Sequence, residues 1–282
     1  MYFLLDLAVH TALDILYLIP YLYATYLILE YIEHHTRSKI RRAVQSAKRF
    51  GPLVGAVLAP VSGCGLSVAS ANFYATRLIS LGTLIAVFLA TSDEMLPLMI
   101  SSGISGTVIF QIILFKVCFA TLAGLLIDLY THKKKQPLGI KELCENHQCG
   151  CHHHGIFKSA LIHTVQLVIF IFLISYLLNI LLALTGTSFL KELITQNPIG
   201  SIFMASLVGL IPNCAISVGL TQLYIENILP ISALIGGLSA NAGVGLIVFW
   251  KMSRSLKETF KIAFLLFACA VISGNTALLI FG

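Results

Sequence analysis

The apolar residues of this chain occur in long runs, and polar residues interrupt those runs at only a few places. A run of about 18 or more apolar residues is long enough to cross about 30 Å of hydrocarbon as a helix. By this criterion the pattern predicts three full crossings in each half of the chain. They are expected at 4–33, 81–103, 106–130, 159–185, 229–250 and 262–281.

Two further apolar runs are broken near their middle. The run 51–80 is interrupted at Pro60–Gly65, and the run 200–227 is interrupted at Pro212–Cys214. Proline removes a backbone donor and glycine loosens a helix. Broken backbone at membrane depth is tolerated only where it is buried in protein or lines a wet cavity. Each of these runs therefore predicts a re-entrant hairpin of two half-helices.

The broken runs belong to a long internal repeat. The stretch from Cys64 to Glu94 aligns without a gap with the stretch from Cys214 to Val244, 150 residues later. Solenoid repeats are about 20–50 residues long, so this period is too long for a solenoid. It is the period of a duplicated half-protein, which is a known plan of membrane transporters.

Composition and charge agree with a membrane protein. Hydrophobic residues make up 57% of the chain and charged residues 11%, whereas a soluble domain carries about 25% charged residues. Fifteen of the 18 Lys and Arg residues fall in the segments 34–50, 131–158 and 251–261. Such clustering follows the positive-inside rule and argues against a nucleic-acid partner, despite the net charge of +6. The seven cysteines do not form a plausible disulfide framework.

The crossings and the basic segments predict one topology. Three crossings and one hairpin in each half place the second half upside down relative to the first, and all three basic segments then face the cytoplasm with the N-terminus outside. The expected fold is an all-α polytopic membrane protein with two inverted-topology repeats and about ten membrane helices. The expected units are a first membrane repeat (1–130), a cytoplasmic linker (131–158) and a second membrane repeat (159–282).

Two adjacent carboxylates lie near the middle of a predicted crossing. Asp93 and Glu94 would each cost about 2.5–3.5 kcal/mol at mid-membrane even on a lenient scale, so they need a reason. They are interpreted as ligands for a hard divalent cation or as proton carriers, with a structural ion pair to Lys116 as the alternative. The matching residues of the second half, Gly243 and Val244, carry no charge, so the predicted site is asymmetric.

The predicted hairpin tips carry a matched pair of Cys and Ser residues. Thiolates suit soft ions, whereas hydroxyl, amide and carbonyl oxygens suit hard ones, so the tips are candidates for either class. Binding of the transported ion is assigned to nine residues, and coupling of its transport to a driving force is assigned to one. The expected ion-binding residues are Asp93, Glu94, Cys64, Ser67, Ser92, Asn213, Cys214, Ser217 and Asn241, with Lys116 as the coupling residue.

The linker between the halves holds a dense tract of Cys and His. These residue types are ligands for soft and borderline metals. Their spacing is not that of a closed zinc finger, so the tract is interpreted as a flexible cytoplasmic chelator that delivers, senses or buffers metal. The alternative is an incidental polar linker. The predicted metal ligands are Cys144, His147, Cys149, Cys151, His152, His153 and His154.

Several motifs together resemble one known family. The Ser-Gly-Cys-Gly-Leu-Ser motif at Ser62–Ser67, with Gly82–Val87 and Thr91–Glu94, resembles the first signature of the bacterial ten-helix heavy-metal exporters. Gly209–Ala215 and Gly236–Gly245 resemble the second signature. The resemblance covers nearly the whole chain and includes the Cys/His linker.

The resemblance implies export of a metal or metalloid ion across the inner (plasma) membrane of a bacterial cell. Members of the family are named either as arsenic efflux proteins or as manganese transporters. One departure concerns the first hairpin tip: relatives usually carry Pro closely before the Cys, as Pro212 precedes Cys214, whereas Ser62 and Gly63 precede Cys64 here.

These observations favour a secondary-active exporter of a divalent cation such as Mn²⁺, driven by protons or by the membrane potential. An arsenite or organoarsenical permease is one alternative, because the paired Cys and the chelating linker suit a softer substrate. A membrane metal sensor acting through the Cys/His linker is another. No catalytic or nucleotide-binding motif supports an enzyme, and no cofactor is expected, since the metal is the substrate. The lipid bilayer is the expected partner, and a homodimer is left open.

Overall fold

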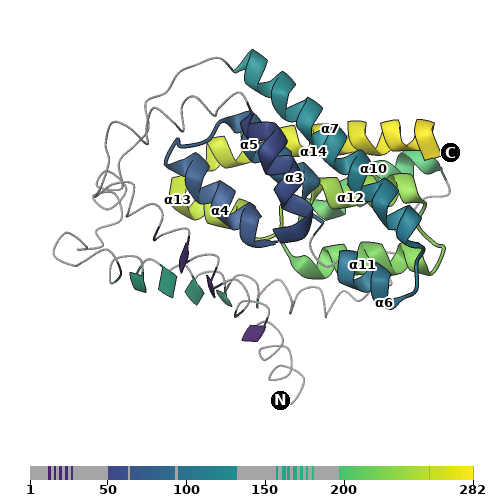
Figure 1. Cartoon of the computed structure of the whole chain (residues 1–282), viewed down its shortest axis with the longest axis horizontal. Coiled ribbons are helices and arrows are strands. Elements are labelled where there is room, and N and C mark those ends of the chain that lie inside the picture. Colours follow the sequence, from purple (N-terminus) through teal and green to yellow (C-terminus); the bar gives the residue numbers. More distant parts are fainter. Residues whose placement is uncertain are drawn as a thin grey trace.

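The computed structural model describes most of the two predicted membrane repeats. Residues 50–62, 64–92, 95–131, 197–253 and 255–281 are described without a break, together with isolated positions between 12 and 27 and between 157 and 180. These residues form α-helices joined by turns (Figure 1). The predicted crossings 4–33 and 159–185, the basic segment 34–50 and the linker 131–158 lie wholly or largely outside the described residues.

The helices of the two halves follow the same order. The first half contains α3 (Gly51–Ser62), α4 (Cys64–Ala75), α5 (Leu81–Ala90), α6 (Met95–Ser101) and α7 (Gly106–Tyr130). The second half contains α10 (Pro198–Gly209), α11 (Cys214–Ile225), α12 (Ile231–Ala240), α13 (Gly245–Ser253) and α14 (Leu256–Phe281). Four pairs of helices begin 150 residues apart, so the repeat in the sequence recurs as a matching series of helices. These pairs begin at Cys64 and Cys214, Leu81 and Ile231, Met95 and Gly245, and Gly106 and Leu256.

Both interrupted runs form two short helices, as the sequence predicts. Each of α3, α4, α10 and α11 has 12 residues. At 1.5 Å per residue such a helix is about 18 Å long, which is too short to cross the hydrocarbon alone. Pro60 lies inside α3, so the first run is divided after Ser62, where α3 ends, rather than at the proline. In the second run, Asn213 caps α11 by accepting a hydrogen bond from the amide of Ala215 at 3.1 Å.

Two crossings that the pattern predicts as continuous are also interrupted. The crossing 81–103 breaks between α5 and α6, and the crossing 229–250 breaks between α12 and α13. In the second break, the side chain of Asn241 accepts from the amide of Gly243 at 2.8 Å, and Gly243 adopts a φ of +52°. Asparagine stabilises such turns through its own side chain, and glycine takes positive φ without strain. Apolar periodicity does not register such local bonds, so the pattern predicted both spans, which remain candidate membrane crossings, but not the break within each.

The other described crossings agree closely with expectation, apart from one boundary. The crossing predicted at 106–130 coincides with α7. The predicted basic loop 251–261 is largely helical instead, because α13 extends to Ser253 and α14 begins at Leu256. Lysine is a good helix former, so a cluster of basic residues does not by itself end a helix.

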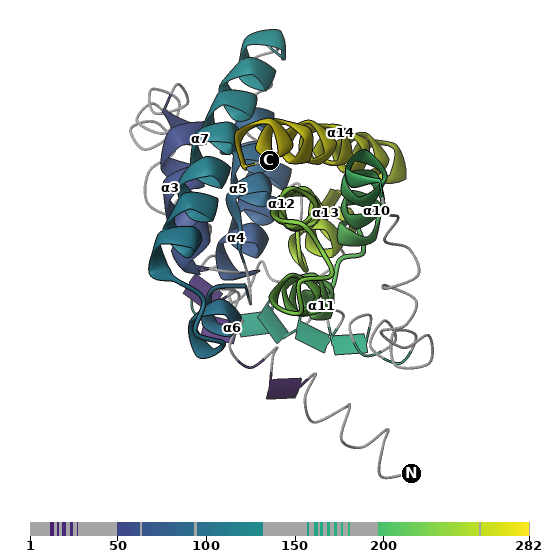
Figure 2. The same ribbon diagram turned by 90° about the vertical axis from the view of Figure 1, so that its right-hand side faces the viewer.

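The centre of the molecule consists of α5 and α12. Every residue of each helix except the first is buried. Helix α5 packs between α3 and α7, and α12 packs between α10 and α14 (Figure 2). Small residues allow the close crossings: a Cβ atom on Gly124 would lie 2.6 Å from the carbonyl oxygen of Gly82, and one on Gly274 would lie 3.1 Å from that of Ser232. These two close helix–helix contacts occupy matching positions of the repeat.

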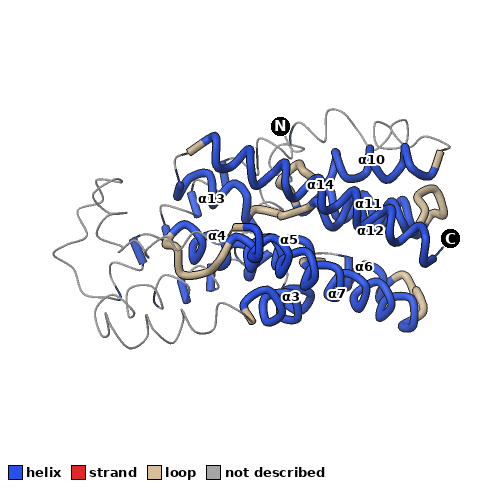
Figure 3. The backbone as a smooth tube through the Cα atoms, turned by 90° about the horizontal axis from the view of Figure 1, so that it is seen from above, coloured by secondary structure: helices blue, strands red, loops and turns tan. Residues whose placement is uncertain are grey.

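The two halves are joined by an exchange of short helices. Helix α4 of the first half packs against α13 of the second, and α11 of the second half packs against α6 of the first (Figures 1 and 3). At the first contact, a Cβ atom on Gly245 would lie 2.9 Å from the carbonyl oxygen of Ser67. In the first broken crossing, α6 is therefore covered by α11 of the second half. In the second broken crossing, α13 is covered by α4 of the first half.

Polar residues collect at one end of the bundle. Asp128, near the end of α7, accepts from the hydroxyl of Ser80 at 2.6 Å and from the amide of Gly82 at 2.8 Å. Tyr74, near the end of α4, lies within electrostatic reach of Asp128 and of Glu258 in the first turn of α14. The end of α7 therefore lies at the same end of the molecule as the start of α14.

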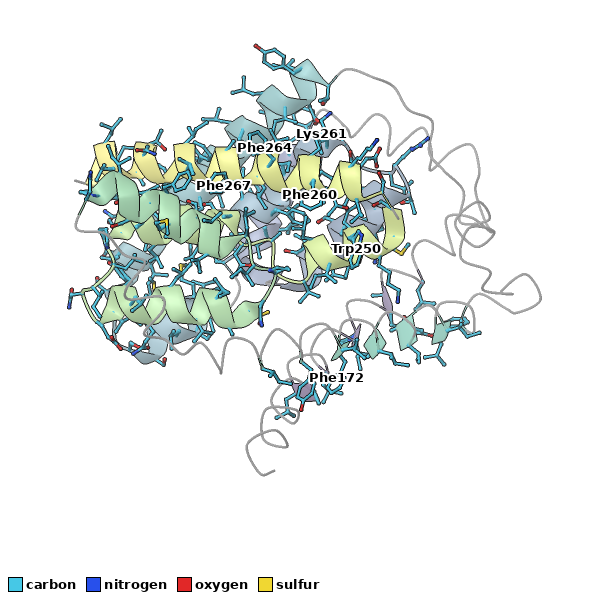
Figure 4. All side chains as sticks on the ribbon, turned by 180° about the vertical axis from the view of Figure 1, so that it is seen from behind. Phe172, Trp250, Phe260, Lys261, Phe264 and Phe267 are labelled. Carbon is cyan, nitrogen blue, oxygen red and sulfur yellow. The ribbon has the colours of Figure 1, made fainter. Side chains whose placement is uncertain are left out.

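The outer surface suits a lipid environment. Four helical stretches in the described part of the chain are long and apolar enough to cross a membrane. On α14, Phe260 and Phe264 lie one helical turn apart, and 70% and 73% of their surfaces are exposed (Figure 4). Exposed aromatic side chains on an apolar helix are accommodated by lipid. The described part of the chain is therefore helical and has the apolar helices of a membrane protein. The four stretches are Leu81–Ser101, Gly106–Tyr130, Ile231–Ser253 and Leu256–Phe281.

Candidate ion site

A buried lysine links the two central helices. Lys116 of α7 is 1% exposed, and its ammonium group donates to the carbonyl oxygen of Thr91 at 2.6 Å and to that of Leu238 at 3.4 Å. Thr91 is the C-terminal cap of α5, and Leu238 lies in the last turn of α12. Carbonyl groups at helix C-termini lack intrahelical partners and carry partial negative charge. Together these two helix ends form a position that favours a cation, and Lys116 occupies it.

Helix α4 reaches the same place through Ser67. The hydroxyl oxygens of Ser67 and Thr91 are 3.1 Å apart, and the Thr91 hydroxyl donates to the carbonyl oxygen of Val87 at 2.6 Å. Since the Thr91 proton is used in that bond, Ser67 is the donor to Thr91. Both side chains are buried. The half-helix that begins at Cys64 is thereby tied to the interruption of the first broken crossing.

The residues after Thr91 continue the buried polar segment. Ser92 is 1% exposed and its hydroxyl donates to the carbonyl oxygen of Ala90 at 3.3 Å. Its own carbonyl oxygen accepts from the amide of Met95, the first residue of α6. Asp93 and Glu94 lie between Ser92 and Met95 in the sequence and are outside the described residues.

The matching segment of the second half is arranged differently. Asn241, at the repeat position of Thr91, is 2% exposed, and its amide nitrogen has no hydrogen-bond partner. Ser217, at the position of Ser67, donates to the carbonyl oxygen of Cys214 at 2.7 Å within its own helix. Leu266, at the position of Lys116, is fully buried and apolar. The second half therefore supplies neutral groups, as the sequence comparison indicated.

The predicted site residues do not all gather in one place. Ser67, Ser92 and Lys116 gather around Thr91, whereas Asn213 and Ser217 make hydrogen bonds within or just before α11. Cys214, at the start of α11, is half-buried and packs against the core around α5. The remaining predicted ligands lie outside the described residues, and the side chain of Cys64 is not described. These ligands are Asp93, Glu94, Cys144, His147, Cys149, Cys151, His152, His153 and His154.

The carbonyl oxygens of Thr91 and Leu238 are the groups that sequence reasoning missed. A backbone oxygen carries no residue-type signal, and its availability depends on where a helix ends. In the sequence, only the position of Thr91 directly before the predicted ligand Ser92 pointed to the carbonyl oxygen of Thr91. Within the described part of the chain no three His, Cys, Asp or Glu residues gather as a metal site. The described groups that could contact a cation here are hydroxyl, amide and carbonyl oxygens, which are ligands for hard ions.

Comparison with known proteins identifies one family. Residues 5–187 match the family described as "Putative, 10TM heavy-metal exporter". This match covers more than half of the chain, including α3 to α7 and the Cys/His linker. Searches of curated proteins and of solved structures gave no match.

Proposed function

The chain belongs to the 10TM heavy-metal exporter family, and we propose that it exports a divalent cation such as Mn²⁺ by a secondary-active mechanism. Membership of an exporter family points to a transporter rather than an enzyme. The observation that carries the choice of a cation is the position of the Lys116 ammonium group, 2.6 Å from the carbonyl oxygen of Thr91. A place that holds the positive charge of Lys116 is a place that a substrate cation can take over.

The neighbouring residues support a hard divalent ion. Asp93 and Glu94 follow Ser92 directly in the sequence, so their carboxylates are candidates to complete a set of oxygen ligands. Carboxylate, carbonyl and hydroxyl oxygens are the ligands that such ions prefer. A charged substrate also compensates the cost of two carboxylates in the membrane, which a neutral arsenic hydroxide would not do.

Lys116 would couple substrate binding to a second event. Two unit positive charges 4 Å apart repel each other by about 4 kcal/mol at an effective dielectric constant of 20. A divalent cation therefore enters this place only when Lys116 moves away or releases its proton to water. Lys116 would release a proton when the metal binds and take up a proton after the metal leaves. Protons would in this way be exchanged for the metal ion.

Two inverted repeats would build the framework of this transporter. Support comes from the matching starts of four helix pairs and from the exchange of α4 and α11 between the halves. Further support comes from α7 and α14, which are matching helices. Since α7 ends where α14 begins, the two run in opposite senses across the bundle. In this arrangement the hairpins α3–α4 and α10–α11 enter from opposite sides and meet near the middle, where inverted-repeat transporters bind their substrates.

The same arrangement supports one orientation in the membrane. Lys257 and Lys261 lie near the start of α14, at the end of the bundle that also holds Arg77 and Asp128. By the positive-inside rule this end faces the cytoplasm of a bacterial cell, with the linker 131–158 on the same side. The Cys/His tract of the linker would bind metal there before export.

Ion uptake into everted membrane vesicles tests the proposal. Vesicles containing the protein are offered Mn²⁺, Fe²⁺, Zn²⁺, Co²⁺ and arsenite at several pH values, beside vesicles without it. We expect protein-dependent, pH-dependent uptake of Mn²⁺ or another divalent cation. Uptake of arsenite without any divalent cation would contradict the proposed substrate, and absence of uptake for the whole panel would contradict the proposed function.

A further inference from the structure

Helix α4 carries a buried amide side chain that the site described above does not use. Asn72 is fully buried, and within the described part of the chain neither its amide oxygen nor its amide nitrogen has a hydrogen-bond partner. Buried polar groups are nearly always hydrogen-bonded, and an exception calls for an explanation such as a water molecule or an ion. Both polar atoms of one side chain are unsatisfied among the described residues, so this amide can still accept one hydrogen bond and donate another.

The fold of α4 does not require this amide. The carbonyl oxygen of Asn72 accepts from the backbone amide and the hydroxyl of Thr76 at 3.0 and 3.1 Å, so its main chain is satisfied without the side chain. The repeat does not require a buried amide either. Gln222, at the matching position of α11, is exposed and donates to Glu226 at 3.2 Å. An apolar side chain would therefore satisfy packing at position 72 at least as well.

The place of Asn72 along α4 suggests a role in transport. Ser67, which contacts the central site, lies five residues before it, and Arg77, at the polar end of the bundle, lies five residues after it. At 1.5 Å per residue, Asn72 is about 7.5 Å along the helix from Ser67, roughly midway between the two. An ion moving from the cytoplasmic end toward Thr91 would pass this level of the bundle.

We propose that Asn72 is a further residue of the ion pathway, where its amide binds the hydration water of the exported cation before the cation reaches the central site. This inference rests on the proposed function. The amide oxygen accepts a hydrogen bond from a water of the hydration shell, and the amide nitrogen donates to a second water. Small divalent cations keep several of their waters when proteins bind them, so a water-binding amide suits this step.

The test compares Mn²⁺ uptake by everted vesicles containing the wild type, Asn72→Leu or Asn72→Asp. Leucine fills the space without polar atoms, and aspartate keeps an oxygen acceptor. We expect Asn72→Leu to lower uptake at low Mn²⁺ about tenfold, mainly through a higher KM, as the loss of both hydrogen bonds to the hydration water predicts. Asn72→Asp should retain most of the uptake. The melting temperature in detergent should stay equal or rise for Asn72→Leu, because a burial penalty is removed.

Two control variants separate this role from general effects. Ser206→Ala removes a fully buried hydroxyl of α10, which lies beside Gly236 and has no partner among the described residues, and Gln222→Leu changes the matching repeat position. Both should transport Mn²⁺ like the wild type. If Asn72→Leu does not fold, Asn72→Ala decides instead.

The outcomes distinguish this inference from the proposed function. Absence of ion uptake by the wild type contradicts both. Normal uptake and KM in a folded Asn72→Leu or Asn72→Ala protein overturns the pathway role alone, and so does loss of uptake in a folded Asn72→Asp protein.

Discussion

The ammonium group of Lys116 lies 2.6 Å from the carbonyl oxygen of Thr91, so α7 places a positive charge at the end of α5. The same group reaches Leu238 in the other half of the molecule. One side chain thus contacts the ends of both central helices. Any rearrangement of those helices that accompanies transport must change these two bonds.

Replacement of Lys116 tests its coupling role. Lys116→Met keeps an unbranched side chain but removes the charge, so a cation can enter without displacing a proton. We expect Mn²⁺ uptake to lose most of its pH dependence, measured as initial rates in everted vesicles between pH 6 and 9. The control is Leu266→Met at the matching repeat position, which is buried and apolar. Unchanged transport with an unchanged pH profile in Lys116→Met would rule out coupling through this residue.

Neutralising the acidic pair tests the divalent substrate. The double variant Asp93→Asn, Glu94→Gln keeps the shape of both side chains and removes two negative charges. We expect cells that produce it to lose metal tolerance, because a hard cation loses its charged ligands. Growth in graded Mn²⁺ measures the effect, with protein abundance in the membrane checked in parallel. Glu226→Gln on the exposed end of α11, which removes one negative charge away from the site, is the control. Full tolerance in the double variant would overturn the divalent substrate.

The crossing of α5 and α7 provides a prediction about stability. A Cβ atom on Gly124 would lie 2.6 Å from the carbonyl oxygen of Gly82, and backbone atoms cannot give way cheaply. Gly124→Val should destabilise the fold by about 3 kcal/mol, the upper range of overpacking effects. A Cβ atom on Gly106, at the start of α7, would have no neighbouring atom within 4 Å. Gly106→Ala should therefore change stability by less than about 0.5 kcal/mol. Thermal unfolding in detergent measures both variants, and equal melting temperatures would contradict the crossing.

The Cys/His linker separates a transporter from a sensor. Changing Cys144, Cys149 and Cys151 to Ser and His152, His153 and His154 to Ala removes most of the predicted soft-metal ligands. We expect Zn²⁺ binding by the purified protein to fall, while vesicle uptake of Mn²⁺ stays within about twofold of the wild type, since a twofold change corresponds to only about 0.4 kcal/mol. Loss of metal tolerance in cells with full vesicle uptake would favour the sensor interpretation.

The membrane class, the repeat and most helix positions could be predicted from the sequence. Apolar runs and basic segments depend on composition along the chain, so they predicted α7 and the division of two runs into short helices closely. The asymmetry between Lys116 and Leu266 was also visible by alignment of the halves. The breaks after α5 and α12 were not predicted, because single side-chain bonds such as that of Asn241 to Gly243 decide them.

By itself the sequence determined that this is a helical membrane protein built from two related halves, since hydrophobic length and charge distribution respond to the bilayer directly. Only the tertiary structure decided which groups meet at the centre. The carbonyl oxygens of Thr91 and Leu238 became a position for a cation because two helices end beside each other and beside Lys116. The unsatisfied amide of Asn72 became apparent for the same reason, since a missing partner can be recognised only when the surroundings of a side chain are known.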